Sequence, residues 1–174
     1  MQREQLNLTE GDGYEALKGH VYDKAKAARE RYGNPPTLTK FREMLKDGDI
    51  VRHSTDLVFD SSALLDGEPA IAIMNEGASP RSFRLVVHER YEGRDADVVT
   101  LAAYHIPSIN YLDIVTHEEA ELFGAALSGL GVEAYYDRVC ELADELGAAA
   151  SHAETPLDLI DGSMGCGTGC GCHG

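Results

Sequence analysis

The chain has 174 residues, of which 43% are hydrophobic, and it carries 15 basic against 30 acidic side chains. This length and composition are typical of one globular domain, and a formal net charge of −15 argues against partners such as nucleic acid or anionic membrane surfaces. The sequence contains no apolar run of membrane-spanning length and no apolar stretch of the signal-peptide kind at its start, so we expect a cytoplasmic protein.

Two helices are predicted at the N-terminal end. Thr9 can cap the first one, whose apolar residues recur at gaps of three and four as far as Tyr32. Gly33 and the prolines after it end this helix. A short helix over residues 38–46 follows and is closed by Gly48. Neither helix is long enough to be stable alone, so both are expected to pack on the rest of the domain.

Residues 50–106 are predicted to form an antiparallel meander of four to five strands. β-Branched and aromatic residues recur in the segments IVRH, LVF, AIAIM, SFRLVVHERY and DVVTLAAYHI, which turn-forming residues separate. The connections are too short for the helical crossovers that parallel strands usually need. The last two segments are expected to pair as a hairpin around residues 93–94.

The chain then returns to a helical pattern. Thr116 and Glu119 form a capping-box motif, which predicts a helix from about residue 117 to Gly131. A partner helix follows from residue 132 and is expected to end at Gly147. The sequence therefore predicts an α+β fold in which two N-terminal helices precede the sheet and a C-terminal helical hairpin covers one sheet face.

The predicted organisation is a single globular α+β domain over residues 1–147, followed by a linker and flexible Gly/Cys tail over residues 148–174. The linker holds Leu157, Leu159 and Ile160, which can dock on the folded body. Charge divides unevenly along the chain: from Asp95 onward there are fourteen acids and one base, a net charge of −13, against −2 before it. We expect the second half to attract cations or a basic protein partner.

Familiar catalytic machinery is not evident in the sequence, because no nucleophile elbow, phosphate-binding loop, zinc-protease motif or dinucleotide fingerprint occurs. In the predicted hairpin His88 would face Thr100, and His105 would face Phe83, so the two histidines are not neighbours. An enzyme with a pocket on the sheet that uses His53, His88 or His105 remains an alternative.

Glu118 and its acidic neighbours fit the start of a helix better than a metal site, and Cys140 is expected to be a buried, inert thiol.

The last ten residues, GCGTGCGCHG, hold the strongest chemical signal. Cys166, Cys170, Cys172 and His173 supply four soft or borderline metal ligands within eight residues. A closed tetrahedral site would be strained on so short a loop, whereas open coordination of zinc, copper, nickel or an iron–sulfur species is easier. The Cys-Gly-Cys segment resembles the planar nickel site of acetyl-CoA synthases.

These patterns favour a small acidic accessory protein, similar to a metallochaperone, that binds or delivers a soft metal ion through this tail. Thiol exchange or enzymatic modification of the tail is a second interpretation of the same cysteines. A non-catalytic interaction module with an acidic surface and an incidental tail is a third.

Overall fold

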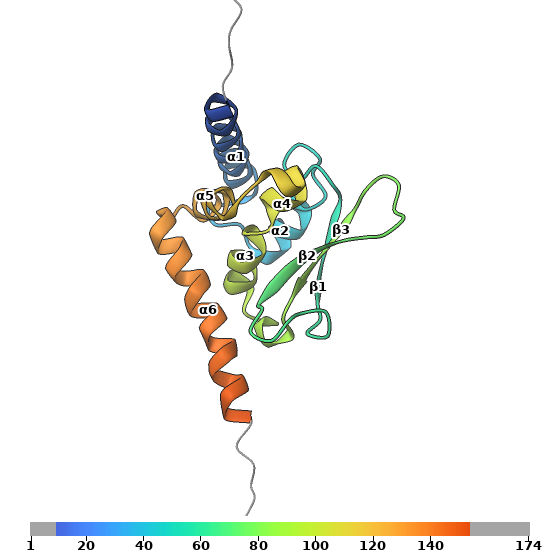
Figure 1. Ribbon diagram of the computed structural model, residues 1–174, viewed down its shortest axis with the longest axis vertical. Coiled ribbons are helices and arrows are strands. Elements are labelled where there is room, and N and C mark those ends of the chain that lie inside the picture. The colour runs from blue at the N-terminus through green and yellow to red at the C-terminus, as the bar shows by residue number, and fades with distance from the viewer. Residues whose placement is uncertain (1–9, 154–174) are drawn as a thin grey trace, which may run out of the picture.

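The computed structural model describes residues 10–153, and the side chains of residues 11–147. Its elements are, in chain order, α1 Glu10–Tyr32, α2 Leu38–Met44, β1 Thr55–Phe59, β2 Ala70–Met74, β3 Phe83–Val87, the 3-10 helix η1 Glu89–Tyr91, α3 Asp95–Ala103, α4 Ile106–Tyr111, the 3-10 helix η2 Leu112–Ile114, α5 His117–Ser128 and α6 Val132–Ala153. Figure 1 shows the small sheet on one side of the molecule and the long helices α1 and α6 on the other. The predicted α+β class is confirmed.

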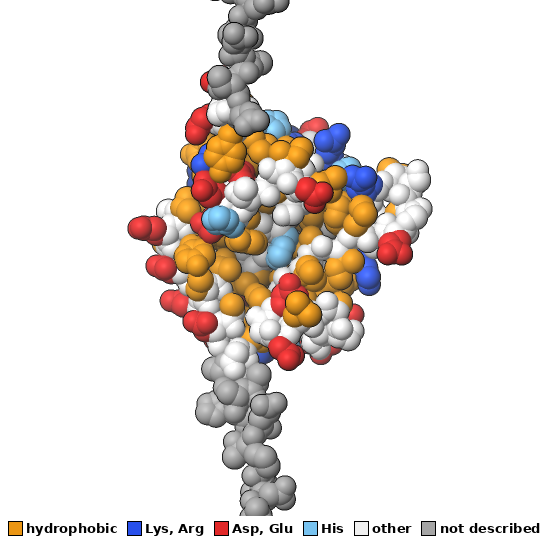
Figure 2. Space-filling model, viewed as in Figure 1, with side chains coloured by type: hydrophobic (Ala, Val, Ile, Leu, Met, Phe, Trp, Pro, Cys, Tyr) orange, Lys and Arg blue, Asp and Glu red, His pale blue; other side chains and the backbone are white. Residues whose placement is uncertain are grey.

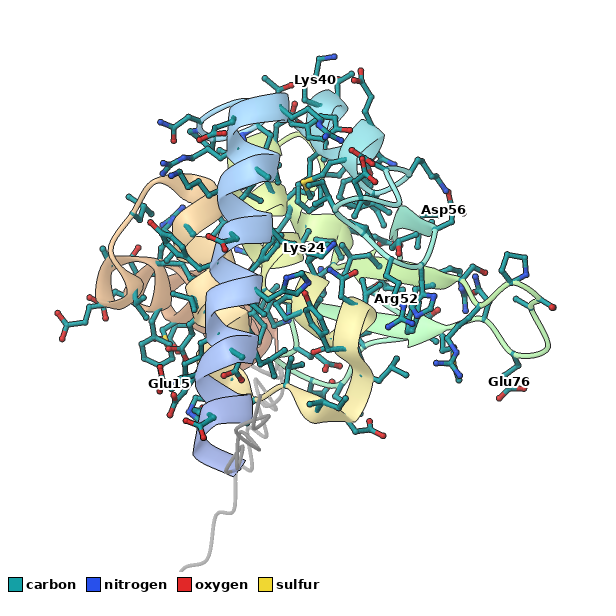
Figure 3. All side chains as sticks on the ribbon, turned by 90° about the horizontal axis from the view of Figure 1, so that it is seen from above. Glu15, Lys24, Lys40, Arg52, Asp56 and Glu76 are labelled. Carbon is teal, nitrogen blue, oxygen red and sulfur yellow. The ribbon has the colours of Figure 1, made fainter. Side chains whose placement is uncertain are left out.

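Both predicted N-terminal helices are present. α1 buries Val21, Ala25 and Ala28, which lie three or four residues apart and therefore share one face. The chain leaves α1 through Gly33, whose φ of 123° is accessible to glycine and costly for other residues. Lys24 extends from α1 and donates a hydrogen bond to the carbonyl of Asp49, which ties α1 to the segment before the sheet (Figure 3).

The sheet has three strands in the order β1-β3-β2, and β3 pairs parallel to β1 and antiparallel to β2. The predicted antiparallel meander of four to five strands is therefore wrong. β1 and β3 reach parallel alignment without a helical crossover because β2 lies between them in sequence, so the chain reverses direction twice, once between β1 and β2 and once between β2 and β3. Residues 50–53, a predicted strand, form a turn and loop before β1.

The second error concerns residues 95–103, which form α3 instead of a strand. Val98, Val99, Leu101 and Ala102 are all buried, so this short helix is apolar on nearly every side. Such a run carries no period that separates a buried helix from a buried strand. The predicted hairpin around residues 93–94 therefore does not form, and neither does its pairing of His88 with Thr100.

The C-terminal helices begin as predicted and end differently. The capping box at the start of α5 is present, with Glu119 accepting from the Thr116 backbone N–H at 2.8 Å. Gly129 caps the other end in a left-handed conformation with φ of 71°, two residues before the predicted end. α6 continues through Gly147 to Ala153; an exposed glycine costs a helix only about 1 kcal/mol.

Packing between the layers also differs from the prediction. α3, instead of the C-terminal helices, makes the main helical contact with β2 and β3, while α5 lies against both α1 and α6. Two buried tyrosines fix α6 to this core: Tyr135 donates to the carbonyl of Thr100, and Tyr91 donates to that of Leu142. Gly124 permits the close approach, because a Cβ there would lie 2.0 Å from the Tyr135 ring.

Among residues 10–153 no helix is both long enough and apolar enough to cross a membrane.

Candidate functional site

The predicted metal ligands Cys166, Cys170, Cys172 and His173 lie outside the described residues. The described chain ends at Ala153, thirteen residues before the first of these cysteines. Among the described side chains, those of residues 11–147, no group of three or more His, Cys, Asp or Glu is arranged to hold a metal ion.

The three histidines of the enzyme hypothesis each have a separate structural partner. His53 packs on the ring of Phe83, with the ring centroids 5.8 Å apart. The Nδ1 atom of His88 accepts a hydrogen bond from the Arg90 backbone N–H at 3.1 Å, which caps η1. His53 lies by the first residue of β3 and His88 follows the last, so five residues, or about 16 Å of strand, separate these two positions. The structure does not assemble them into a shared metal-holding cluster.

The pKa of His105 departs strongly from that of a free imidazole. Burial lowers the pKa of its imidazole to about 4, and a hydrogen bond with the Ala70 backbone opposes part of that shift. The ring also packs edge-on against Tyr104, with centroids 5.6 Å apart. At neutral pH the imidazole is therefore uncharged and helps to hold the chain after α3 against the start of β2.

A cluster of polar and ionisable side chains lies between α5 and α6. His117 and Glu121 on α5, together with Tyr104 and Tyr136, line a hollow of about 410 Å³. The thiol of Cys140, expected to be buried, is half-buried and hydrogen-bonds to Tyr136, which raises the pKa of that phenol. Burial raises the pKa of Tyr104 as well. Both phenols are thus protonated at neutral pH and can donate hydrogen bonds to a ligand.

Sequence reasoning did not find this cluster. Its only signal is the spacing of four residues between His117 and Glu121, and again between Tyr136 and Cys140, which places each pair on one helix face. That spacing does not reveal that the two faces meet.

A mainly apolar hollow lies on another part of the surface, where three segments meet, and has a volume of about 460 Å³. Its lining comes from the loop after α1, the first turns of α3 and the end of α5: Pro35, Pro36, Thr37, Leu38, Asp95, Ala96, Val99, Thr100, Ser128 and Leu130. We call it the corner groove. Leu130 and Val132, at the turn from α5 to α6, are 47% and 41% exposed and extend its apolar surface. Asp95 is the one charged side chain in its lining.

An ion-pair network attaches α6 to α3. Arg138 contacts Asp97 at 2.6 Å and Glu141 at 2.9 Å, and Arg94 contacts Asp97 at 2.8 Å and Glu145 at 2.7 Å. The single basic residue after Asp95 is therefore already paired with acids.

The remaining acids of α6 form an uncompensated face. Glu133, Asp137 and Asp144 are exposed and lie four and seven residues apart, so they share one side of the helix. Figure 2 shows acidic side chains along the margin of the molecule next to α6. We call this side of the helix the acidic face of α6.

Comparisons with known proteins give no relative: no family model, curated protein or solved structure matches the chain.

Proposed function

We propose that the protein is a small acidic accessory protein that binds or delivers a soft metal ion, or an iron–sulfur species, through its C-terminal tail. Cys166, Cys170 and Cys172 are the main ligands and His173 is auxiliary. One observation carries this proposal: three thiols and an imidazole fall within eight residues, and they follow a body whose described side chains, residues 11–147, offer no competing group of three ligands.

The chemistry of these donors defines the class of metal. Thiolates prefer Cu(I), zinc and iron–sulfur clusters, and imidazole suits zinc, copper and nickel. Several donors on one short segment raise their effective concentration for the same ion without a preformed pocket. Because thiols must lose their protons to bind, affinity is expected to fall as the pH falls.

The described helices suggest how a client could meet the metal. α6 has 22 residues and is thus about 33 Å long, with the corner groove beside its start and the tail after its end. The thirteen residues from 154 to 166 can extend over about 44 Å. A client held at the corner groove therefore lies within reach of Cys166, and the acidic face of α6 offers a basic client complementary charge.

Metal titration of the reduced protein under anaerobic conditions tests the proposal. Cu(I), Zn(II) and Ni(II) are added to the full chain, to a chain that stops at Gly165, and to a chain with Cys166, Cys170 and Cys172 changed to Ser. The full chain is expected to bind at least one of these ions stoichiometrically and the other two proteins to lose that binding. Cys140→Ser, which leaves the tail intact, is the matched control. Equal binding by all four proteins would contradict the proposal.

A second candidate is a non-catalytic interaction module whose tail plays no part. The corner groove favours it, because Leu130 and Val132 leave apolar surface exposed next to a ready hollow, as partner-binding sites do. Pull-downs with the full chain and with the chain ending at Gly165 separate the two candidates. An identical set of partners for both proteins supports the interaction module, whereas loss of a partner with the tail supports delivery.

A further inference from the structure

A third hollow lies beside the C-terminal part of α6, the last described element of the chain. It has a volume of about 400 Å³ between the β1–β2 connection, η1 and α6, and its lining is Ser61, Leu64, Leu65, Asp66, Gly67, His88, Arg90 and Leu146. We call it the α6 hollow. Its lining mixes leucine side chains with polar and charged ones, and Leu65 within it is 78% exposed.

We propose that the segment Leu157–Ile160 folds back from the end of α6 and packs into the α6 hollow. This inference goes beyond the proposed function and does not depend on metal binding. It rests on the position of the hollow, the reach of the chain and the charge of Arg90, which is opposite to that of the acids in and next to the segment.

The position of Leu146 gives the first argument. Leu146 lines the hollow, and α6 continues for seven more residues to Ala153, a rise of about 10 Å. Residues 154–156 span about the same distance when extended. Leu157 is therefore the first residue that can return to the level of Leu146. Figure 1 shows the end of α6 and the β1–β2 connection toward the same end of the molecule.

The sequence of the segment suits this return path. Pro156 cannot continue a helix, and it favours extended backbone at the residue before it. Leu157, Leu159 and Ile160 bring three apolar side chains to a hollow whose walls include Leu64, Leu65 and Leu146.

Charge complementarity gives the second argument. Asp158 lies within the segment and Asp161 follows it. Arg90 in the hollow is exposed and can pair with either carboxylate. The Nδ1 atom of His88 accepts a hydrogen bond from the Arg90 backbone N–H, so the ring carries its hydrogen on Nε2. That Nε2–H is a second group in the hollow that can donate a hydrogen bond to a carboxylate. Asp66 also lines the hollow, so the acids of the segment are expected on the side of Arg90.

A short linker connects the segment to the folded body, so its effective concentration at the hollow is higher than that of a free peptide in solution. Binding of the chain's own segment is therefore favoured over binding of a foreign peptide. Docking also has a consequence for the tail. Five residues, 161–165, separate the segment from Cys166, so the first cysteine would stay within about 17–21 Å of the hollow.

The absence of tryptophan from the chain allows a direct test. Leu65→Trp places a single tryptophan at the hollow, in the metal-free, reduced full-length protein. We expect its emission to shift to the red, and its quenching by acrylamide to increase, when Leu157, Leu159 and Ile160 are all changed to Ser. Val132→Trp, a probe at the other end of α6, is the matched control and should not respond to the three serines.

A charge exchange gives a second test that leaves the apolar side chains of the segment in place. In the Leu65→Trp protein, Arg90→Glu is expected to expose the probe, and Asp158→Arg added to it is expected to restore protection. Equal quenching with and without the three serines would overturn the proposal. Protection that rises with protein concentration would overturn it too, because the occupant would then be a second copy. Since no metal is present, neither result bears on metal binding by the tail.

Discussion

Acidification is expected to destabilise the folded protein through His105, and His105→Gln should remove that part of the response. The imidazole is uncharged in the folded state because burial lowers its pKa from 6.5 to about 4. In the unfolded chain the same ring is exposed and titrates near 6.5. The unfolded state therefore binds a proton over a pH range in which the folded state does not.

The sign and size of the effect follow from this difference. Stability contributed by the neutral ring is fully present above pH 6.5 and is lost as the pH falls toward 4, where the folded state also becomes protonated. A gap of about 2.5 pKa units, at 1.36 kcal/mol per unit, corresponds to roughly 3 kcal/mol of unfolding free energy. That is a large share of the 5–15 kcal/mol typical of a domain.

Urea unfolding followed by far-UV circular dichroism, repeated between about pH 4 and pH 7, measures this loss. Carboxylates with lowered pKa values, such as Glu118 and Glu145, also lose stabilising charge on acidification, but they are present in both proteins and cancel in the difference. The gap between the native and His105→Gln curves should therefore change by about 3 kcal/mol across this range. Parallel curves would refute the reasoning, whatever the stability of the variant at neutral pH.

Further outcomes follow from the packing and capping of α5. Gly124→Ala should destabilise the protein by about 1–3 kcal/mol, because its Cβ would displace Tyr135. Gly19→Ala in α1, where a Cβ meets nothing within 4 Å, should be neutral or slightly stabilising in thermal unfolding. Equal losses would contradict the packing account. Thr116→Ala removes the hydroxyl that caps α5 and should cost about 1 kcal/mol. NMR titration of that variant should also show a higher pKa for Glu119. Burial raises the pKa of this carboxyl group, but hydrogen bonds from Thr116 hold it below the usual value. An unchanged pKa of Glu119 in the variant would argue against this effect of Thr116.

The helical parts of the fold could be predicted from the sequence because their signals are local. The capping box at Thr116 and Glu119 and the glycine stop at Gly33 depend on residues a few positions apart, and both are present. Residues 95–103 were misassigned because a helix buried on nearly all sides has the same apolar composition as a buried strand. Strand order was missed because the pairing of β1 with β3 depends on contacts beyond the range of sequence periodicity.

The candidate sites also differ in whether the sequence alone reveals them. Cys166 to His173 form a dense local pattern that is visible in the sequence alone. The corner groove and the α6 hollow each combine several segments distant along the chain, so no window of sequence contains them. Pro35, Val99 and Leu130, for example, are ordinary core or turn residues until the fold places them together.

The metal content of protein purified anaerobically tests the central claim most directly. Elemental analysis of the full chain is expected to show a soft metal in near-stoichiometric amount, and the chain that ends at Gly165, prepared in parallel, should carry none. A full-length protein without bound metal, or equal metal in both proteins, would contradict the account.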